Sequence, residues 1–199
     1  IDPAAAKGLY VKTKAMATQA VLASAAQGLD AVVVHPSVIT GPNDFGNGHL
    51  TGLVLDYLNG GLKLCVQGGY DFVDVRDVAK GILLAAEHGR RGQCYILSNR
   101  FFPVIEVLDL LHEISGKKKI KTVLPLWFVQ ACAPLAETYY KLRRHSPLYT
   151  SYSLYSFFNN ANFSNAKAVR ELGYSTRDMK VTLKDTVVFL REHRRLMYT

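Results

Sequence analysis

The strongest constraint on the fold is a long helix of small residues that is followed at once by a short apolar strand. Residues 4–27 are crowded with Ala and small polar side chains, which suit close packing against a sheet. Gly28 then supplies a signal that ends a helix, and residues 30–34 are Asp-Ala-Val-Val-Val. A short apolar run without polar alternation is typical of a parallel strand buried on both faces. We therefore expect an α/β protein built on a parallel sheet.

The chain after this unit keeps alternating between extended and helical patterns. Further short strands are expected at 62–66 and 94–97, and a final amphipathic helix at about 183–195. Pro103 stands at the first-turn position that tolerates proline, and Gly116 supplies the stop signal of that helix. A helix over 75–87 is indicated by apolar residues at helical spacing, namely Val78, Ala79, Ile82, Leu83 and Ala86.

The segment after the 30–34 strand is the expected place for a ligand. Pro36, Gly41 and Pro42 should break the strand into a loop. In open parallel sheets, ligands bind beyond the carboxyl ends of the strands. A cofactor ring should therefore lie at this loop.

Tyr10 and Lys14, on the preceding helix, form a candidate acid/base pair. Residues four apart lie on one helical face, so a phenol and an ammonium at this spacing can act on one substrate atom. A free phenol titrates near pH ~10, and a nearby cation lowers its pKa, as proton transfer at neutral pH requires. Taken alone, the spacing is more typical of an exposed ion beside an aromatic ring. The apolar strand and its loop directly after the helix favour the catalytic interpretation.

The composition argues against several classes of partner. At 199 residues and 49% hydrophobic, the chain can bury a sizeable core. The formal net charge is +8, but the cations are scattered at helix ends without interleaved aromatic residues, so we expect no nucleic-acid partner. No stretch is long and apolar enough to span a membrane. The 3 cysteines are widely separated, which offers no metal-ligand pair and predicts reduced thiols in a cytoplasmic protein.

Several motifs in register resemble one enzyme family over nearly the whole chain. The matching residues are Tyr10 with Lys14, residues 35–37 (HPS) with 41–42 (GP), 72–79 (FVDVRDVA), 94–98 (CYILS), 162–164 (NFS) and 171–174 (ELGY). In that order and spacing they are similar to the C-terminal two thirds of an extended short-chain dehydrogenase/reductase, in the NAD-dependent epimerase/dehydratase and dihydroflavonol-reductase-like group.

The resemblance implies an NAD- or NADP-dependent oxidoreductase that acts on a small molecule. In the reductive direction Tyr10 would give a proton to the carbonyl oxygen that receives hydride, and in the oxidative direction it would act as the base. Lys14 would support the phenolate and hold the ribose hydroxyls. The backbone around Pro36, Ser37 and Val38 would border the nicotinamide. Similar proteins also imply a homodimer that pairs through the Tyr10 helix.

The resemblance further implies how the chain is divided. Residues 1–100 would form the C-terminal part of a Rossmann-type, doubly wound parallel sheet. Residues 101–199 would form a small, mostly helical substrate-binding region, interleaved with the sheet. Its apolar and aromatic section at 124–158 would either cover the substrate cleft or form packed core. The family's Gly-rich turn and active-site Ser or Thr precede the matching part, so we interpret the chain as a fragment of a longer protein.

One departure from the family bears on the substrate. Relatives that act on nucleotide sugars commonly carry an Arg two residues before the Phe72-Val73 pair, where it grips a diphosphate, and here that position is Tyr70. Loss of a bidentate phosphate donor favours a ketone or aldehyde on a less charged molecule. A nucleotide-sugar epimerase or dehydratase is the enzyme alternative. A redox-inactive dinucleotide-binding protein or a remnant is the non-catalytic one, and Asp74, Arg76 and Asp77 are assigned to helix capping and ion pairing.

Overall fold

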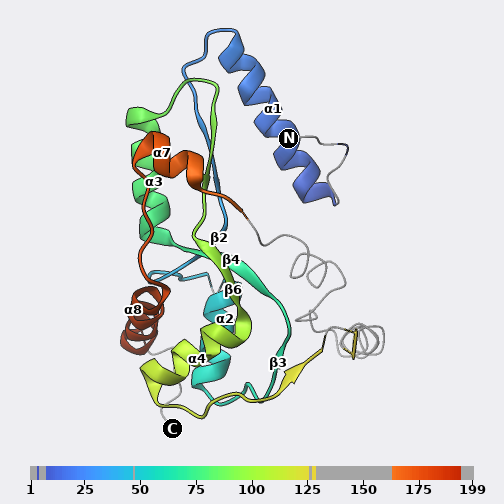
Figure 1. The fold of residues 1–199 in the computed structure, drawn as a ribbon, viewed down its shortest axis with the longest axis vertical. Coiled ribbons are helices and arrows are strands. Elements are labelled where there is room, and N and C mark those ends of the chain that lie inside the picture. Colours follow the sequence, from blue (N-terminus) through green and yellow to red (C-terminus); the bar gives the residue numbers. More distant parts are fainter. Residues whose placement is uncertain (1–3, 5–7, 47, 126, 129–162, 194–199) are drawn as a thin grey trace.

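The computed structural model describes residues 4, 8–46, 48–125, 127–128 and 163–193. The described chain contains both helices and strands, and Figure 1 shows their arrangement in space. In chain order the elements are α1 (Leu9–Ala26), β1 (Val33–Pro36), β2 (Val38–Thr40), α2 (His49–Leu58), β3 (Cys65–Val66), β4 (Gly69–Asp74), α3 (Val75–His88), β5 (Cys94–Leu97), β6 (Arg100–Pro103), α4 (Val104–Ser115), β7 (Val123–Leu124), α7 (Ala166–Leu172) and α8 (Met179–Glu192).

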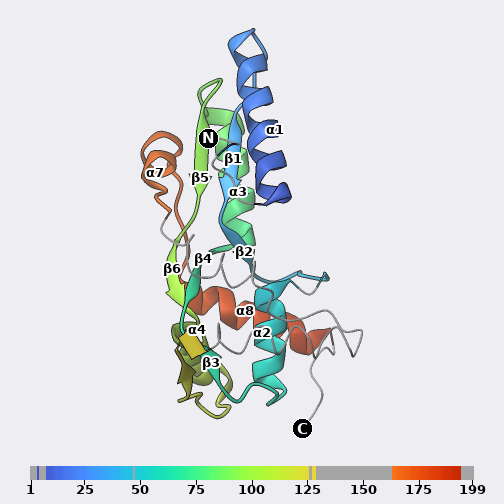
Figure 2. The same cartoon turned by 90° about the vertical axis from the view of Figure 1, so that its right-hand side faces the viewer.

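Strands β1 and β5 form a parallel pair that lies between helices. The register runs from Val33 opposite Cys94 to Pro36 opposite Leu97. Figures 1 and 2 show α1 on one side of these strands and α3 on the other. Helices on both faces of parallel strands characterise the doubly wound α/β fold. The buried cluster of this part consists of Val73, Val78, Ala85, Tyr95, Leu97, Ala168, Leu172 and Tyr174.

A second sheet of order β2-β4-β6 carries the other core. β2 runs parallel to β4, and β6 runs antiparallel to it. Helices α2, α4 and α8 gather around this sheet in the lower half of Figure 1. Their buried apolar residues include Leu50, Val54, Phe72, Phe102, Val107, Leu111, Leu183 and Leu190. The short strands β3 and β7 form a separate parallel pair.

Two neighbouring stretches of chain connect the first sheet to the second. β1 leads to β2 through Ser37 alone, and β5 leads to β6 through Ser98 and Asn99. The Ser37 N–H donates to the carbonyl oxygen of Leu97 at 3.1 Å, which ties the two stretches together. The carboxyl ends of β1 and β5 therefore lie at the junction of the two sheets.

Most of the predicted elements are present, and their differences have local causes. The strand expected at 30–34 is found two or three residues later, at Val33–Pro36, where it pairs with β5. The loop expected directly after Pro36 is wrong, because Val38–Thr40 forms a strand paired with β4. The last helix begins earlier than predicted, at Met179, since the Asp178 carboxylate caps it by accepting from the Lys180 N–H.

Helix α3 spans the predicted residues but does not bury the whole predicted stripe. Val78 is buried, whereas Ile82 and Leu83 are 47% and 65% exposed. The buried positions include Gly81 and Ala85. A Cβ on Gly81 would lie 2.9 Å from both terminal methyls of Leu97, so the helix approaches β5 through its smallest residues rather than its largest.

Helix α1 contacts the rest of the described chain sparingly. Its buried residues are Ala15, Thr18 and Ala25, whereas Leu9 and Met16 are exposed. In Figure 1 the helix leans away from the strands at its N-terminal end. Within the described residues, no helix has the length and apolar character needed to cross a membrane. The section at 124–158 lies almost entirely outside the described residues.

Candidate active site

Tyr10 and Lys14 lie together on an exposed face of α1, as the helical spacing predicts. The Lys14 Nζ is 5.8 Å from the centroid of the Tyr10 ring, and Tyr10 is 71% exposed. The hydroxyls of Thr13 and Thr18 donate to the carbonyl oxygens of Tyr10 and Lys14, at 2.9 Å and 3.0 Å. Among the described residues no carboxylate pairs with Lys14. In the described part of the chain, the Lys14 ammonium therefore faces the Tyr10 ring without a counter-ion.

Pro36, Ser37 and Val38 lie where β1 ends and β2 begins. Pro36 is exposed, while Ser37 and Val38 are half-buried. The Ser37 backbone is held by Leu97, and its hydroxyl donates to Asp71 Oδ1 at 2.8 Å. The segment is therefore held at Ser37 from two directions, through the backbone and through the side chain.

Asp71 is a buried residue at this junction that the sequence analysis did not single out. It is 1% exposed, and its Oδ1 also accepts from the Asn99 N–H at 2.9 Å. Burial raises the pKa of Asp71, and the hydrogen bonds from Asn99 and Ser37 offset only part of that rise. A signal was present in the sequence, because the charged residue stands between the aromatic residues Tyr70 and Phe72.

The Tyr10–Lys14 pair and the Pro36–Val38 segment are separate groups in this structure. Helix α1 precedes β1 along the chain and lies beside the β1–β5 pair (Figure 2), whereas the Pro36–Val38 segment runs from the end of β1 to the start of β2. Among the described residues no hydrogen bond joins Tyr10 or Lys14 to Ser37.

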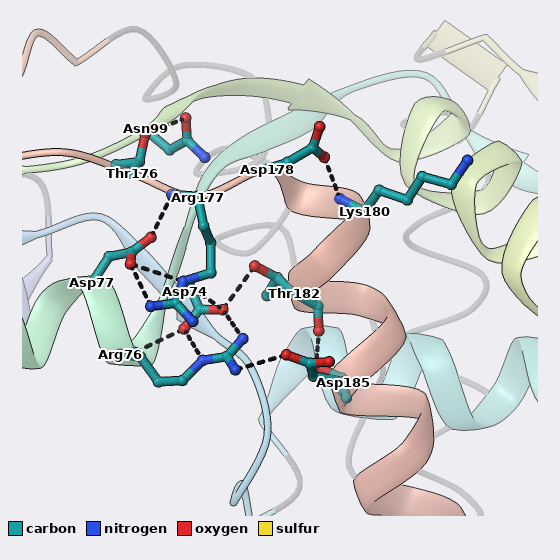
Figure 3. Close-up of polar contacts among 11 residues, drawn as sticks. Asp74, Arg76, Asp77, Asn99, Thr176, Arg177, Asp178, Lys180, Thr182 and Asp185 are labelled. Carbon is teal, nitrogen blue, oxygen red and sulfur yellow. Dashed lines mark hydrogen bonds and ion pairs between the residues drawn. The ribbon is translucent and has the colours of Figure 1, made fainter.

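A network of carboxylates and guanidinium groups lies next to this junction, between α3 and α8 (Figure 3). Asp74 caps α3 by accepting from the Arg76 N–H at 2.8 Å, and it also accepts from Arg76 Nη2 and the Thr182 hydroxyl, both at 2.7 Å. Asp77 accepts from the backbone N–H and the Nε of Arg177, both at 2.8 Å. The predicted roles of Asp74, Arg76 and Asp77 in capping and ion pairing are confirmed.

The network sets the protonation of its central carboxylate. Burial alone would raise the pKa of Asp74, but hydrogen bonds from Arg76 and Thr182 and the charge of Arg177 hold that pKa below its usual value. The hydrogen bond to Asp74 in turn raises the pKa of Arg76. Both shifts favour the charged forms of Asp74 and Arg76, and the network ties β4, α3 and α8 together. In the described part of the chain, no cluster of three or more His, Cys, Asp or Glu residues could hold a metal ion.

The order of elements and motifs agrees with a known family. The family model of the NAD-dependent epimerase/dehydratase family matches residues 2–98, from α1 through β5. The chain belongs to this family over that stretch. Tyr10, Lys14 and the Pro36–Val38 segment all lie inside the matched residues.

Curated relatives extend the likeness beyond the family model. "Sterol demethylase protein B" of Methylococcus capsulatus is 29% identical over 187 residues, which cover 92% of this chain and 56% of that protein. A Synechocystis protein named as a dihydroflavonol 4-reductase is 32% identical over 190 residues, with coverage of 94% and 55%. A farnesyl-dihydroquinoline-oxide ketoreductase of Stigmatella aurantiaca is 31% identical over 175 residues, with coverage of 84% and 51%. The chain spans about half the length of these relatives.

Solved structures share the fold. The protein gox2253 has a TM-score of 0.81 at 28% identity, covering 99% of this chain and 60% of that one. A nucleoside-diphosphate-sugar epimerase from Pseudomonas aeruginosa has a TM-score of 0.76 at 23% identity, covering 98% and 59%. WbmF of Bordetella bronchiseptica, solved with NAD+ and UDP, has a TM-score of 0.69 at 18% identity, covering 98% and 56%. The likeness confirms the Rossmann-type α/β class.

Tyr70, at the position of the expected diphosphate-binding Arg, is half-buried at the start of β4. Its ring meets Phe72 edge-on, with the centroids 5.7 Å apart. Across the strands, the Arg100 guanidinium lies 3.8 Å from the centroid of the Phe102 ring and pairs with Glu106. This guanidinium is already engaged, so it does not substitute for the missing one.

Proposed function

We propose that the protein is an NAD(P)-dependent oxidoreductase that reduces a ketone or aldehyde, or catalyses the reverse reaction. The observation that carries the proposal is the Tyr10–Lys14 pair, with the ammonium 5.8 Å from the phenol ring on an exposed helical face. The reductase and ketoreductase names of two relatives support it. The donor set fits a nicotinamide dinucleotide, because it offers a phenol for the reacting oxygen and, for ribose hydroxyls, an ammonium that no carboxylate of the described residues pairs.

The proposed chemistry assigns one task to each group. The nicotinamide, when bound, supplies or accepts the hydride. Tyr10 donates its phenolic proton to the carbonyl oxygen as that oxygen becomes an alcohol, and it takes the proton back in the oxidative direction. Lys14 stabilises the phenolate by its positive charge and hydrogen-bonds to the ribose hydroxyls. The Pro36–Val38 backbone holds the ring beside the substrate.

The same proposal assigns different parts of the chain to cofactor and substrate binding. Residues 1–100 would contribute to the cofactor domain, and residues 101–199 to the substrate-binding side. A homodimer formed through α1 and a cytoplasmic location belong to the same proposal. The choice between NAD and NADP would be made by residues outside the matching part.

Substitution of the pair in the protein expressed from its complete coding sequence tests the role of Tyr10 and Lys14. Tyr10→Phe should lower kcat by at least about 100-fold, because the general acid is lost, while NAD(P)H binding stays nearly unchanged. Lys14→Met should lower kcat and also weaken cofactor binding. Lys12→Met is the matched control, since Lys12 is exposed on the same helix but points away from Tyr10. Unchanged turnover in Tyr10→Phe would refute the assigned role.

A nucleotide-sugar epimerase or dehydratase is the second candidate, favoured by the family model and by the sugar-nucleotide enzymes among the fold neighbours. Tyr70 argues against it. Calorimetry with UDP and dTDP separates the two: micromolar binding of either would favour the epimerase. Cofactor binding without any turnover on carbonyl substrates would favour a redox-inactive dinucleotide-binding protein.

A further inference from the structure

Asp71 joins three strands through one oxygen atom. The residue lies in β4, while its partners Ser37 and Asn99 follow the ends of β1 and β5. Both hydrogen bonds end on Oδ1, at 2.8 Å and 2.9 Å. The contact thus lies where the chain passes from the parallel β1–β5 pair to the second sheet.

Placing a carboxyl group here is costly. Asp71 is 1% exposed, and its Oδ2 has no hydrogen-bond partner among the described residues. Its neighbours Phe72 and Val73 show that the strand can be filled with apolar side chains, which would avoid the desolvation of a polar group. A costly buried acceptor is expected to persist where the geometry that it imposes has a use.

The geometry that Asp71 imposes concerns Ser37. The Ser37 N–H is bound to Leu97 and the Ser37 hydroxyl is bound to Asp71, so both the peptide and the side chain have fixed directions. Without the carboxylate, only the backbone hydrogen bond to Leu97 would hold Ser37 at this point. The peptides on either side of Ser37 belong to Pro36 and Val38.

We propose that Asp71 is a positioning residue for the nicotinamide half of the cofactor, acting through Ser37 on the Pro36–Val38 backbone. The inference rests on the proposed function. It assigns Asp71 no contact with the cofactor or the substrate. The consequence is selective: loosening this backbone weakens contacts to the nicotinamide ring and leaves the adenine and phosphate contacts, made elsewhere, unchanged.

Two ligands that differ only in the nicotinamide test this selectivity. The complete protein and its Asp71→Ala and Ser37→Ala variants are titrated with NAD(P)H and with ADP-ribose, or its 2′-phosphate if NADP is the cofactor. Asp71→Ala should raise the Kd of NAD(P)H about ten-fold, the effect of one lost hydrogen bond to a charged group, with that of ADP-ribose changed less than about two-fold. Asp71→Asn keeps an acceptor oxygen and should show a smaller loss. The exposed Asp56→Ala is the matched control.

Coupling between the two residues gives a second measurement. If Asp71 acts through Ser37, the two substitutions should not add. The variant that carries both Asp71→Ala and Ser37→Ala should then bind NAD(P)H as tightly as whichever single variant shows the larger loss of affinity. If Asp71→Ala weakened the binding of both ligands equally, or weakened neither, the positioning role would be overturned while the proposed function stayed intact. A wild-type protein that binds neither ligand would overturn the proposed function and this inference with it.

Discussion

Removal of the Asp74 carboxylate should be among the most destabilising single changes in the described chain. Asp74 is 1% exposed and accepts hydrogen bonds from Arg76 and from Thr182, which is itself fully buried. Asp74→Ala would leave the Thr182 hydroxyl without its acceptor and would end the cap of α3. The change therefore acts on three elements at once.

The structure limits the size of the effect. Loss of one partner of a buried ion pair costs about 3–5 kcal/mol. The Arg76 and Arg177 side chains are 35% and 31% exposed, and they keep Asp185 and Asp77 as partners. Both guanidinium groups can therefore recover part of the lost interaction from water and from the remaining carboxylates. We expect the low end of the range, about 3 kcal/mol, of which the lost cap contributes about 1 kcal/mol.

The assay is urea unfolding followed by far-UV circular dichroism, with wild type and variants fitted at a common m-value. Asp178→Ala is the matched control, because Asp178 caps α8 in the same way but lies at the surface. That control should cost about 1 kcal/mol. The two variants should thus differ by about 2 kcal/mol. If Asp74→Ala costs no more than Asp178→Ala, the network contributes nothing beyond a helix cap and the reasoning is wrong.

Further predictions concern two glycines and two pKa shifts. Gly81→Ala would place a Cβ 2.9 Å from the Leu97 methyls, and this overpacking should outweigh the gain in helix propensity by about 1 kcal/mol. Gly52→Ala on α2 meets nothing within 4 Å and should stabilise by about 0.5–1 kcal/mol, so melting temperatures that shift in one direction for both variants would contradict the packing described here. The pKa of Asp74 is lower in the folded than in the unfolded protein, so its stabilisation is present above the unfolded-state pKa of about 3.9 and is lost as the pH falls through the folded-state pKa. The pKa of Asp71 is higher in the folded protein, so its stabilisation is present below about 3.9 and is lost as the pH rises through the folded-state pKa. The stability of wild type relative to Asp74→Asn should therefore shrink in acid while its stability relative to Asp71→Asn grows, and equal pH slopes would refute the assignment.

Local signals predicted the elements that depend on local chemistry. β5 has the predicted bounds, and α4 begins directly after Pro103 and ends directly before Gly116, whose φ of 69° is the left-handed conformation that glycine favours. β2 was missed because its three residues, beside Gly41 and Pro42, become a strand only by pairing with β4, a partner about 34 residues away in the register. Such pairing is a tertiary effect that local propensity does not contain.

The outward face of α3 was missed for a different reason. Helical spacing shows which residues share a face, but it does not show which face approaches a neighbour closely. Here contact with Leu97 and Tyr174 excludes large side chains, so Gly81 faces inward and Leu83 faces outward. The size of the space between two elements decides the orientation, and that size is known only once the partner is placed.

The two aspartates of β4 show how far the sequence defined the candidate site. Asp71 and Asp74 are three residues apart and therefore face opposite sides of the strand. Asp74 precedes a helix, and this local position predicted its capping role. Asp71 has no local signal except its charge, and its partners Ser37 and Asn99 come from distant parts of the chain. Asp74 meets guanidinium groups and has a lowered pKa, whereas Asp71 meets only neutral donors and has a raised one. Two identical side chains on one short strand thus have pKa values shifted in opposite directions, because of residues that no spacing rule connects to them.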